Sequence, residues 1–242
     1  MSAPSDSVRL AAIGDLHVTE DSGRRYHDLF AEISEKADIL ALCGDLTNFG
    51  KISEAESLAE DLRACTIPMV GVLGNHDYEC GQEEEVVRIL RQAGVTILDD
   101  QAVVINDVGF AGVKGFVGGF GRGELGAFGE KAIKAFVEEA QEEARKLENG
   151  LRSLRTDRAV AVLHYAPVAD TVLGEPEEIY PFLGSSRLAD AVDRFENVKA
   201  VVHGHAHRGR YEGRTRRGIP VFNCAQFVVE SQFARPYALL DI

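Results

Sequence analysis

The chain has 242 residues, of which 45% are hydrophobic and 27% charged, and it contains no tryptophan. This composition is ordinary for a globular protein and excludes a largely disordered chain. The formal net charge of −13 argues against long nucleic acids and anionic membranes as partners, because both select a basic surface. It is compatible with a small phosphorylated substrate.

Cysteine usage and the first residues bear on the compartment. Cys43, Cys65, Cys80 and Cys224 are widely spaced, and Cys43 falls inside a predicted strand, which favours reduced thiols over a disulfide framework. The first eight residues lack the basic and apolar regions of a signal peptide, and no apolar stretch approaches membrane-spanning length. We therefore expect a cytoplasmic protein without a membrane partner.

The first third of the chain alternates short apolar runs with amphipathic segments. Runs at 8–13, 39–43 and 69–73 predict strands that are buried on both faces, and 26–37 and 53–64 predict helices between them. This β-α-β-α-β order predicts parallel strands joined by right-handed crossovers.

The middle of the chain changes character after a third predicted helix at 82–93. Three short apolar runs follow, separated by Asp and Asn, and we expect them to begin a second sheet as antiparallel or mixed strands. These runs are Val95–Leu98, Ala102–Ile105 and Val108–Val113. The segment 114–123 is rich in glycine, and a tight surface loop is favoured there over a mobile lid.

The strongest helical pattern in the chain lies at 130–154, where apolar residues recur every three or four positions. Strands are predicted next at 159–163 and 198–202. Three further apolar runs are expected to close the second sheet, at 219–222, 227–229 and 237–240.

Five of the predicted strands end in residues that bind metals or move protons. The five strand ends read Gly14-Asp15-Leu16-His17, Gly44-Asp45, Gly74-Asn75-His76-Asp77, His164 and Gly204-His205-Ala206-His207. Open α/β sheets hold their chemistry just beyond the carboxyl ends of such strands, so we expect these segments to meet at one site. Because the signals interleave from residue 8 to residue 207, residues 1–242 are expected to form one domain.

The candidate ligands combine two carboxylates, one amide oxygen and four imidazoles, a mixed set that suits Mn, Fe or Zn. They are Asp15, His17, Asp45, Asn75, His164, His205 and His207. A single histidine is more often a satisfied core residue, and His27, which lies outside the pattern, is expected at the surface. Seven ligands exceed what one ion with an open position takes, and two ions sharing a carboxylate would use them all. Two ions ~3.5–4 Å apart bind the attacking and leaving oxygens of a phosphoryl displacement and activate a bridging water. The sequence therefore predicts a dinuclear hydrolase.

These five blocks, in this order, resemble the signature of the calcineurin-like metallophosphoesterases. The resemblance implies an α/β fold, the metallo-dependent phosphatase-like four-layer αββα sandwich of two mixed sheets flanked by helices. It implies one metal held by Asp15, His17, Asp45 and His207. It implies a second metal held by Asp45, Asn75, His164 and His205, with Asp45 as the bridge.

The resemblance assigns His76 a catalytic role toward the substrate phosphate and the leaving-group oxygen, beside the bridging Asp45. The protein Ser/Thr phosphatase branch has an aspartate and an arginine where this sequence has Asn48 and Phe49. The missing aspartate weakens acid catalysis by His76, although neighbouring Asp77 would partly compensate. The missing arginine would have gripped a phosphomonoester dianion, which argues against a protein phosphatase.

The leading functional hypothesis is hydrolysis of a small-molecule phosphodiester, such as a cyclic or linear nucleotide, by a metal-bridging hydroxide. A phosphomonoesterase or a nucleotide pyrophosphatase is the alternative, and a non-catalytic metal-binding scaffold is a remote one. The arginines of 208–217 are interpreted as the solvated face of a hairpin, except that Arg208 is as well suited to bind substrate. Tyr78, Phe116 and Tyr165 are candidates for the wall of a base or alkyl pocket, although core or rim packing is favoured for each.

Overall fold

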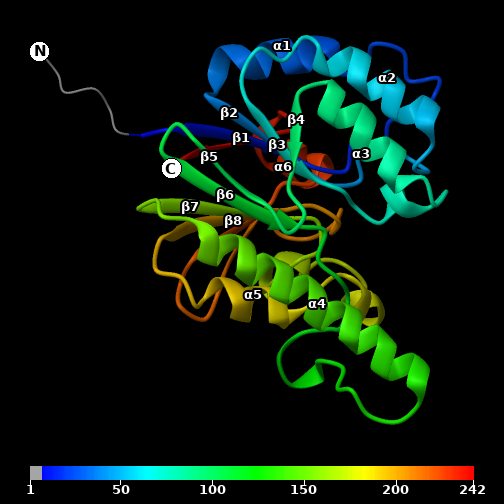
Figure 1. Cartoon of the computed structure of the whole chain (residues 1–242), viewed down its shortest axis with the longest axis vertical. Coiled ribbons are helices and arrows are strands. Elements are labelled where there is room, and N and C mark those ends of the chain that lie inside the picture. The colour runs from blue at the N-terminus through cyan, green and yellow to red at the C-terminus, as the bar shows by residue number, and fades with distance from the viewer. Residues whose placement is uncertain (1–6) are drawn as a thin grey trace, which may run out of the picture.

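Two mixed sheets pack face to face with helices on their outer faces in the computed structural model, which describes residues 7–242 (Figure 1). The first sheet has the strand order β11-β1-β2-β3-β4 and the second β5-β6-β7-β8-β10-β9. The predicted four-layer α/β sandwich is therefore confirmed.

The first sheet is built from β1 (Arg9–Ile13), β2 (Ile39–Cys43), β3 (Met69–Val72), β4 (Val95–Ile97) and β11 (Ala238–Asp241). The helices α1 (His27–Lys36), α2 (Ile52–Leu62) and α3 (Glu83–Gln92) connect β1 to β4. The strands β1 to β4 are parallel, as the alternating pattern predicts. Leu10 and Ala12 face the core between the sheets, whereas Ala11 and Ile13 pack under the helices. This strand is thus buried on both faces, which is why it contains no alternating polar residues.

The second sheet is built from β5 (Ala102–Ile105), β6 (Val108–Val113), β7 (Arg158–Leu163), β8 (Val198–His203), β9 (Glu212–Arg214) and β10 (Pro220–Asn223). Its outer face is covered by α4 (Lys131–Ser153) and α5 (Ser186–Val192) (Figure 1). The shared core between the two sheets includes Val70 and Val72 from β3 and Val160 and Val162 from β7.

Several expected elements differ in the structure. Val95–Leu98 does not belong to the second sheet, because α3 returns the chain so that β4 pairs in parallel with β3. The run 227–229 is helical, within α6 (Gln226–Phe233), and a three-residue apolar run carries no periodicity that separates helix from strand. The run 237–240 forms β11 in the first sheet, where it pairs antiparallel with β1 and covers that edge.

The glycine-rich segment is only partly a surface loop. Gly118 donates to the carbonyl of Pro181 at 2.8 Å, and Gly119 donates to that of Gly184 at 2.9 Å. Both glycines are buried, and exposure begins at the short 3-10 helix Gly121–Gly123. The prediction of a surface loop was therefore wrong for the first half of 114–123, which is anchored to a neighbouring segment.

Of the helices within residues 7–242, none has both the length and the apolar character needed to cross a membrane.

Candidate metal centre

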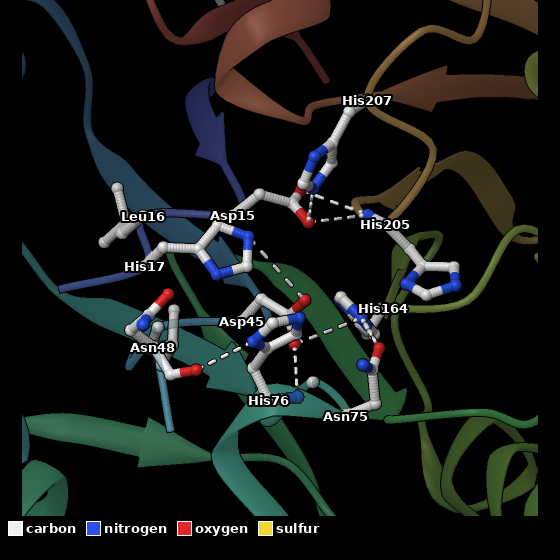
Figure 2. Close-up of polar contacts among 12 residues, drawn as sticks. Asp15, Leu16, His17, Asp45, Asn48, Asn75, His76, His164, His205 and His207 are labelled. Carbon is white, nitrogen blue, oxygen red and sulfur yellow. Dashed lines mark hydrogen bonds and ion pairs between the residues drawn. The ribbon is translucent and has the colours of Figure 1, made fainter. Parts of the chain in front are cut away.

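The candidate site lies beyond the carboxyl ends of five parallel strands, and both sheets contribute to it. The loops after β1, β2 and β3 supply Asp15, His17, Asp45 and Asn75, and the ends of β7 and β8 supply His164, His205 and His207. Figure 2 shows these seven side chains together with His76, gathered around the carboxylates of Asp15 and Asp45.

The backbone of this centre is held in unusual conformations. Four of the candidate ligands have positive φ angles: Asp15 at 61°, His17 at 46°, Asp45 at 49° and His205 at 72°. Such angles cost about 1 kcal/mol or more for residues other than glycine, and they persist only where surrounding contacts hold them. Here the backbone N–H of Asp15 donates to Gly44 at 2.9 Å, and that of His17 donates to Asp45 at 3.0 Å. Adjacent strand ends therefore lock one another.

One group of ligand atoms surrounds the carboxylate of Asp15. Nε2 of His207 lies 3.0 Å from Oδ1 of Asp15, and the backbone N–H of His205 is 3.0 Å from both carboxylate oxygens. His17 completes this group, in which ligand atoms lie within 4.8 Å of one another. Both ring nitrogens of His17 are buried and have no hydrogen-bond partner among the described residues. A bound cation would satisfy one of them.

A second group surrounds Asp45 and includes His164 and His205, again within 4.8 Å. Oδ1 of Asp45 lies 3.4 Å from Nε2 of His164, while Oδ2 lies 3.9 Å from Nε2 of His17. Asp45 thus faces both groups of ligand atoms, which is the position that a bridging carboxylate requires.

The hydrogen bonds of His164 bear on whether a cation fits. Its Nδ1 lies 3.0 Å from the carbonyl oxygen of Cys43, an acceptor, so Nδ1 carries the proton. In the neutral ring, Nε2 then presents a lone pair toward Oδ1 of Asn75 at 3.0 Å and toward Asp45. Three electron-rich atoms facing one another favour a cation between them. His205 is arranged similarly, since its Nε2 donates to the carbonyl of Phe182 at 3.1 Å and leaves Nδ1 as the ligand atom.

Electrostatics agree with this donor set. Burial, together with the charges of Asp15 and Asp77, raises the pKa of Asp45 to about 9. Burial opposes ionisation of Asp15 too, but its bond to His207 and the neighbouring imidazoles lower its pKa. Burial lowers the pKa of His17 to about 4, so this imidazole is neutral and able to bind a metal at neutral pH.

Burial also lowers the pKa values of His164 and His205, which keeps both imidazoles uncharged, with one N–H each. A cation is the one species that would ionise Asp45 and use these lone pairs together. The residues present therefore fit one or more metal ions.

His76 lies at the edge of the centre and is held by a backbone group. Its Nδ1 is 2.7 Å from the carbonyl oxygen of Asn48, and its ring makes an edge contact with that of His17 at 4.5 Å between centroids. A ligand atom of His76 also lies within 4.8 Å of His17 and Asp45. The partner of His76 is therefore a neutral carbonyl in place of a carboxylate.

Asp77 does not compensate for the missing carboxylate, so that expectation was wrong. It is fully buried and accepts hydrogen bonds from the backbone of Leu46, Thr47 and Gly74 and from the hydroxyl of Thr47. Asp77 thus ties the loop after β2 to the loop after β3. Its role is to hold the loops that carry Asp45 and His76.

Some supporting residues had no signal in the sequence. The carbonyl groups of Asn48, Phe182 and Cys43 orient three imidazoles, and a backbone carbonyl is present at every residue. Gln226 of α6 donates to the carbonyl oxygen of Asp15 and so supports the strained loop after β1. Gln226 immediately precedes the apolar run 227–229 that was expected to be a strand, and this position gave no hint of the contact.

The arginines of 208–217 behave largely as expected for a solvated hairpin. Arg214 and Arg216 make exposed ion pairs with Glu212 and Asp190, and β9 and β10 form the hairpin. Arg208 is exposed, and its backbone N–H donates to Glu175 at 2.7 Å. His27 is half-buried on α1, where it contacts Asp28 at 3.2 Å, outside the centre.

The sequence model of the calcineurin-like phosphoesterase family matches residues 8–209, a range that includes every candidate ligand. The chain belongs to this family. It is accordingly a phosphoric ester hydrolase, and family members use metal ions for this chemistry. No curated protein matches the chain.

Solved structures of similar fold agree with the family assignment. The phosphopantetheinyl hydrolase PptH from Mycobacterium tuberculosis is 16% identical with a TM-score of 0.68, over 99% of this chain and 97% of that chain. TT1561 of Thermus thermophilus is 14% identical with a TM-score of 0.55, over 97% and 99%. GAP50, the anchor in the inner membrane complex of Plasmodium, is 13% identical with a TM-score of 0.52, over 91% and 72%. At these identities the likeness concerns the fold alone.

Proposed function

We propose that this calcineurin-like phosphoesterase is a dinuclear enzyme that hydrolyses a small-molecule phosphodiester, such as a cyclic or linear nucleotide. The observation that carries the proposal is the pair of adjacent ligand groups around Asp15 and Asp45, each of which combines a buried carboxylate with two imidazoles. Because both sheets contribute ligands, we also propose that the chain functions as one domain.

The proposed ligands follow the two groups. Asp15, His17, Asp45 and His207 would hold the first metal, and Asp45, Asn75, His164 and His205 would hold the second. The mixed oxygen and nitrogen donors suit Mn, Fe or Zn. When bound, two such ions supply Lewis acidity at the phosphoryl oxygens and a nucleophile that is ionised near neutral pH.

The chain's own residues position the substrate and manage one proton. Since Nδ1 of His76 donates to the carbonyl of Asn48, Nε2 is the ring atom left to act on the leaving-group oxygen, and it donates a proton there when both ring nitrogens are protonated. The carbonyl of Cys43 fixes the tautomer of His164, as outer-shell partners of metal ligands commonly do. Asp77 holds the two loops in register and takes no part in proton transfer.

A diester is favoured over a monoester because the residue after Asn48, whose carbonyl contacts His76, is Phe49, which is 47% exposed. An apolar side chain at this position offers no cation to the second negative charge of a monoester. A phosphomonoesterase or a nucleotide pyrophosphatase is the second candidate. A metal-binding scaffold without activity is a remote third, for which GAP50 offers a precedent of fold only.

The compartment is proposed from the cysteines. Cys43, Cys65, Cys80 and Cys224 are all unpaired in the structure, which is typical of reducing surroundings and supports a cytoplasmic location.

Hydrolysis of bis(p-nitrophenyl) phosphate and of p-nitrophenyl phosphate tests the proposal. The protein is stripped of metal, restored with Mn, Fe or Zn in turn, and compared with Asp45→Asn. We expect metal-dependent turnover with the diester preferred, and an inactive variant. Preference for the monoester would move the second candidate to first place. Metal binding without turnover of either ester would favour the scaffold.

A further inference from the structure

Lys114 lies beside the metal centre, directly after β6, and its backbone is joined to a candidate ligand. Its carbonyl oxygen accepts the backbone N–H of His164 at 3.1 Å and that of Tyr165 at 3.0 Å. The next residue, Gly115, donates its N–H to the buried carboxylate of Glu143 on α4 at 2.8 Å. The backbone of Lys114 is therefore fixed relative to His164.

The ammonium group of Lys114 lies among three aromatic rings. Its Nζ is 5.4 Å from the ring centroid of Tyr78, 5.0 Å from that of Phe116 and 5.5 Å from that of Tyr165. The ring of Tyr165 is in turn 4.5 Å from the imidazole of His205. The ammonium group and the metal centre thus contact the same aromatic ring.

This ammonium group lacks an anionic partner. Within residues 7–242, its one hydrogen bond is to the carbonyl of Gly115, at 2.9 Å, and it forms no ion pair. The nearby carboxylate of Glu143 is engaged elsewhere, because it pairs with Lys146 at 2.9 Å and accepts from Gly115. Two of the three donors of Lys114 are therefore without a protein acceptor, and burial lowers the pKa of this lysine.

A purely structural role would not require the charge. Aromatic rings do attract an ammonium group, but a side chain without charge would fill the same space among Tyr78, Phe116 and Tyr165 with a smaller desolvation cost. A cation that is half-buried, unpaired and next to the centre of a phosphoesterase is suited to an anionic ligand. Lysine commonly binds phosphate as a point charge.

We propose that Lys114 binds a second phosphoryl group of the substrate, one that is not cleaved, so that the enzyme selects phosphoesters bearing a further phosphate. Phosphodiesters that also carry a phosphomonoester belong to this class, and nucleoside bisphosphates and diphosphates present a similar pair of phosphoryl groups without the diester bond. The inference rests on the proposed phosphodiester function and adds a specificity residue outside the metal ligands. Lys114 is therefore a substrate-binding residue that leaves the bond-breaking step to the metal centre.

Calorimetric titration of the Mn-loaded protein tests this inference. The probes are thymidine 3′,5′-bisphosphate and thymidine 5′-diphosphate, each compared with thymidine 5′-monophosphate. We expect at least one doubly phosphorylated probe to bind about 10- to 100-fold more tightly than the monophosphate, since a bond to a charged group is worth this much. Lys114→Met should remove most of that preference and Lys114→Arg should retain most of it.

Lys199→Met is the matched control, because Lys199 is an exposed lysine of β8 whose one side-chain hydrogen bond within residues 7–242 is to the carbonyl of Glu196. It should bind all three probes as the unchanged protein does. An equal loss of affinity for all three probes in Lys114→Met would indicate a structural role and overturn the inference. The inference would also be overturned if the unchanged protein showed no preference for the doubly phosphorylated probes. This second result does not depend on whether a variant folds.

Hydrolysis of bis(p-nitrophenyl) phosphate by the unchanged protein separates the two proposals, because this ester has no second phosphate. Turnover without preference for the doubly phosphorylated probes overturns the role of Lys114 alone. No turnover of this ester, with the preference present, counts against the phosphodiesterase proposal and supports the binding role of Lys114.

Discussion

Replacing Gly204 by alanine tests whether the two ligand groups depend on one closely packed point of backbone. A Cβ atom at Gly204 would lie 2.5 Å from Oδ2 of Asp15 and 2.7 Å from the carbonyl oxygen of Cys43. Asp15 belongs to the first ligand group, and the Cys43 carbonyl orients His164 of the second. A single methyl group therefore disturbs both ligand groups at once.

The expected magnitude follows from these two contacts. Contacts below 3.0 Å are not tolerated, so the carboxylate of Asp15 and the strand end at Cys43 must move by about half an ångström. Overpacking of this kind costs about 1–3 kcal/mol in the free energy of unfolding. Loss of ligand orientation should weaken metal affinity by roughly 10- to 100-fold.

Two measurements on Gly204→Ala check this expectation: titration of the metal-stripped protein with Mn, and urea unfolding. Gly126→Ala is the control, because a Cβ atom at Gly126 meets nothing within 4 Å, and its stability should change by less than about 0.5 kcal/mol. If Gly204→Ala binds Mn as tightly as the unchanged protein, then Asp15 and His164 are not both metal ligands, and the assignment fails.

Three further changes test separate parts of the site. His76→Ala should lower kcat for bis(p-nitrophenyl) phosphate by roughly 10²- to 10⁴-fold at unchanged metal content, whereas lost metal would make His76 a ligand. Phe49→Arg should raise the preference for the monoester about fivefold, the equivalent of ~1 kcal/mol for an exposed ion pair, and Phe128→Arg, on an 88% exposed residue, should not. The third concerns the raised pKa of Asp45, about 9, which means that the metal-free protein loses stability as pH rises toward that value. Between pH 6 and 8 in EDTA, the free energy of unfolding in urea should fall by about 2–3 kcal/mol more than in Asp45→Asn, and equal slopes would refute the shift.

The strands that carry the candidate ligands could be predicted from the sequence because each combines two strong signals. A run such as Ile39–Cys43 is apolar on both faces, and the glycine and aspartate that follow it end the strand abruptly. The topology of the edge strands could not be predicted in this way. β4 has three residues and β11 has four, and the sequence of neither strand indicates which sheet edge it will cover. That choice depends on α3 and on the free edge of β1, which are tertiary features.

The hydrogen-bond partners of the site residues were less predictable from the sequence than the identity of those residues. Asp77 follows His76 in the sequence and so suggested a compensating acid, but the side chain is used to join two loops. The true partner of His76 is a backbone carbonyl, which no residue type signals. Lys114 has no distinguishing signal within the glycine-rich segment of the sequence. Its surroundings are defined in the folded chain, where the rings of Tyr78 and Tyr165 lie next to its ammonium group.

The strain and the burial at this centre have a common consequence. Asp15, His17, Asp45 and His205 hold left-handed backbone conformations, and two of these residues are carboxylates withdrawn from water. Both features raise the free energy of the folded protein without metal, by about 1 kcal/mol or more for each strained residue. A cation that binds the folded state alone stabilises it by mass action and offsets these costs. We therefore expect metal bound at these candidate ligands to raise the free energy of unfolding.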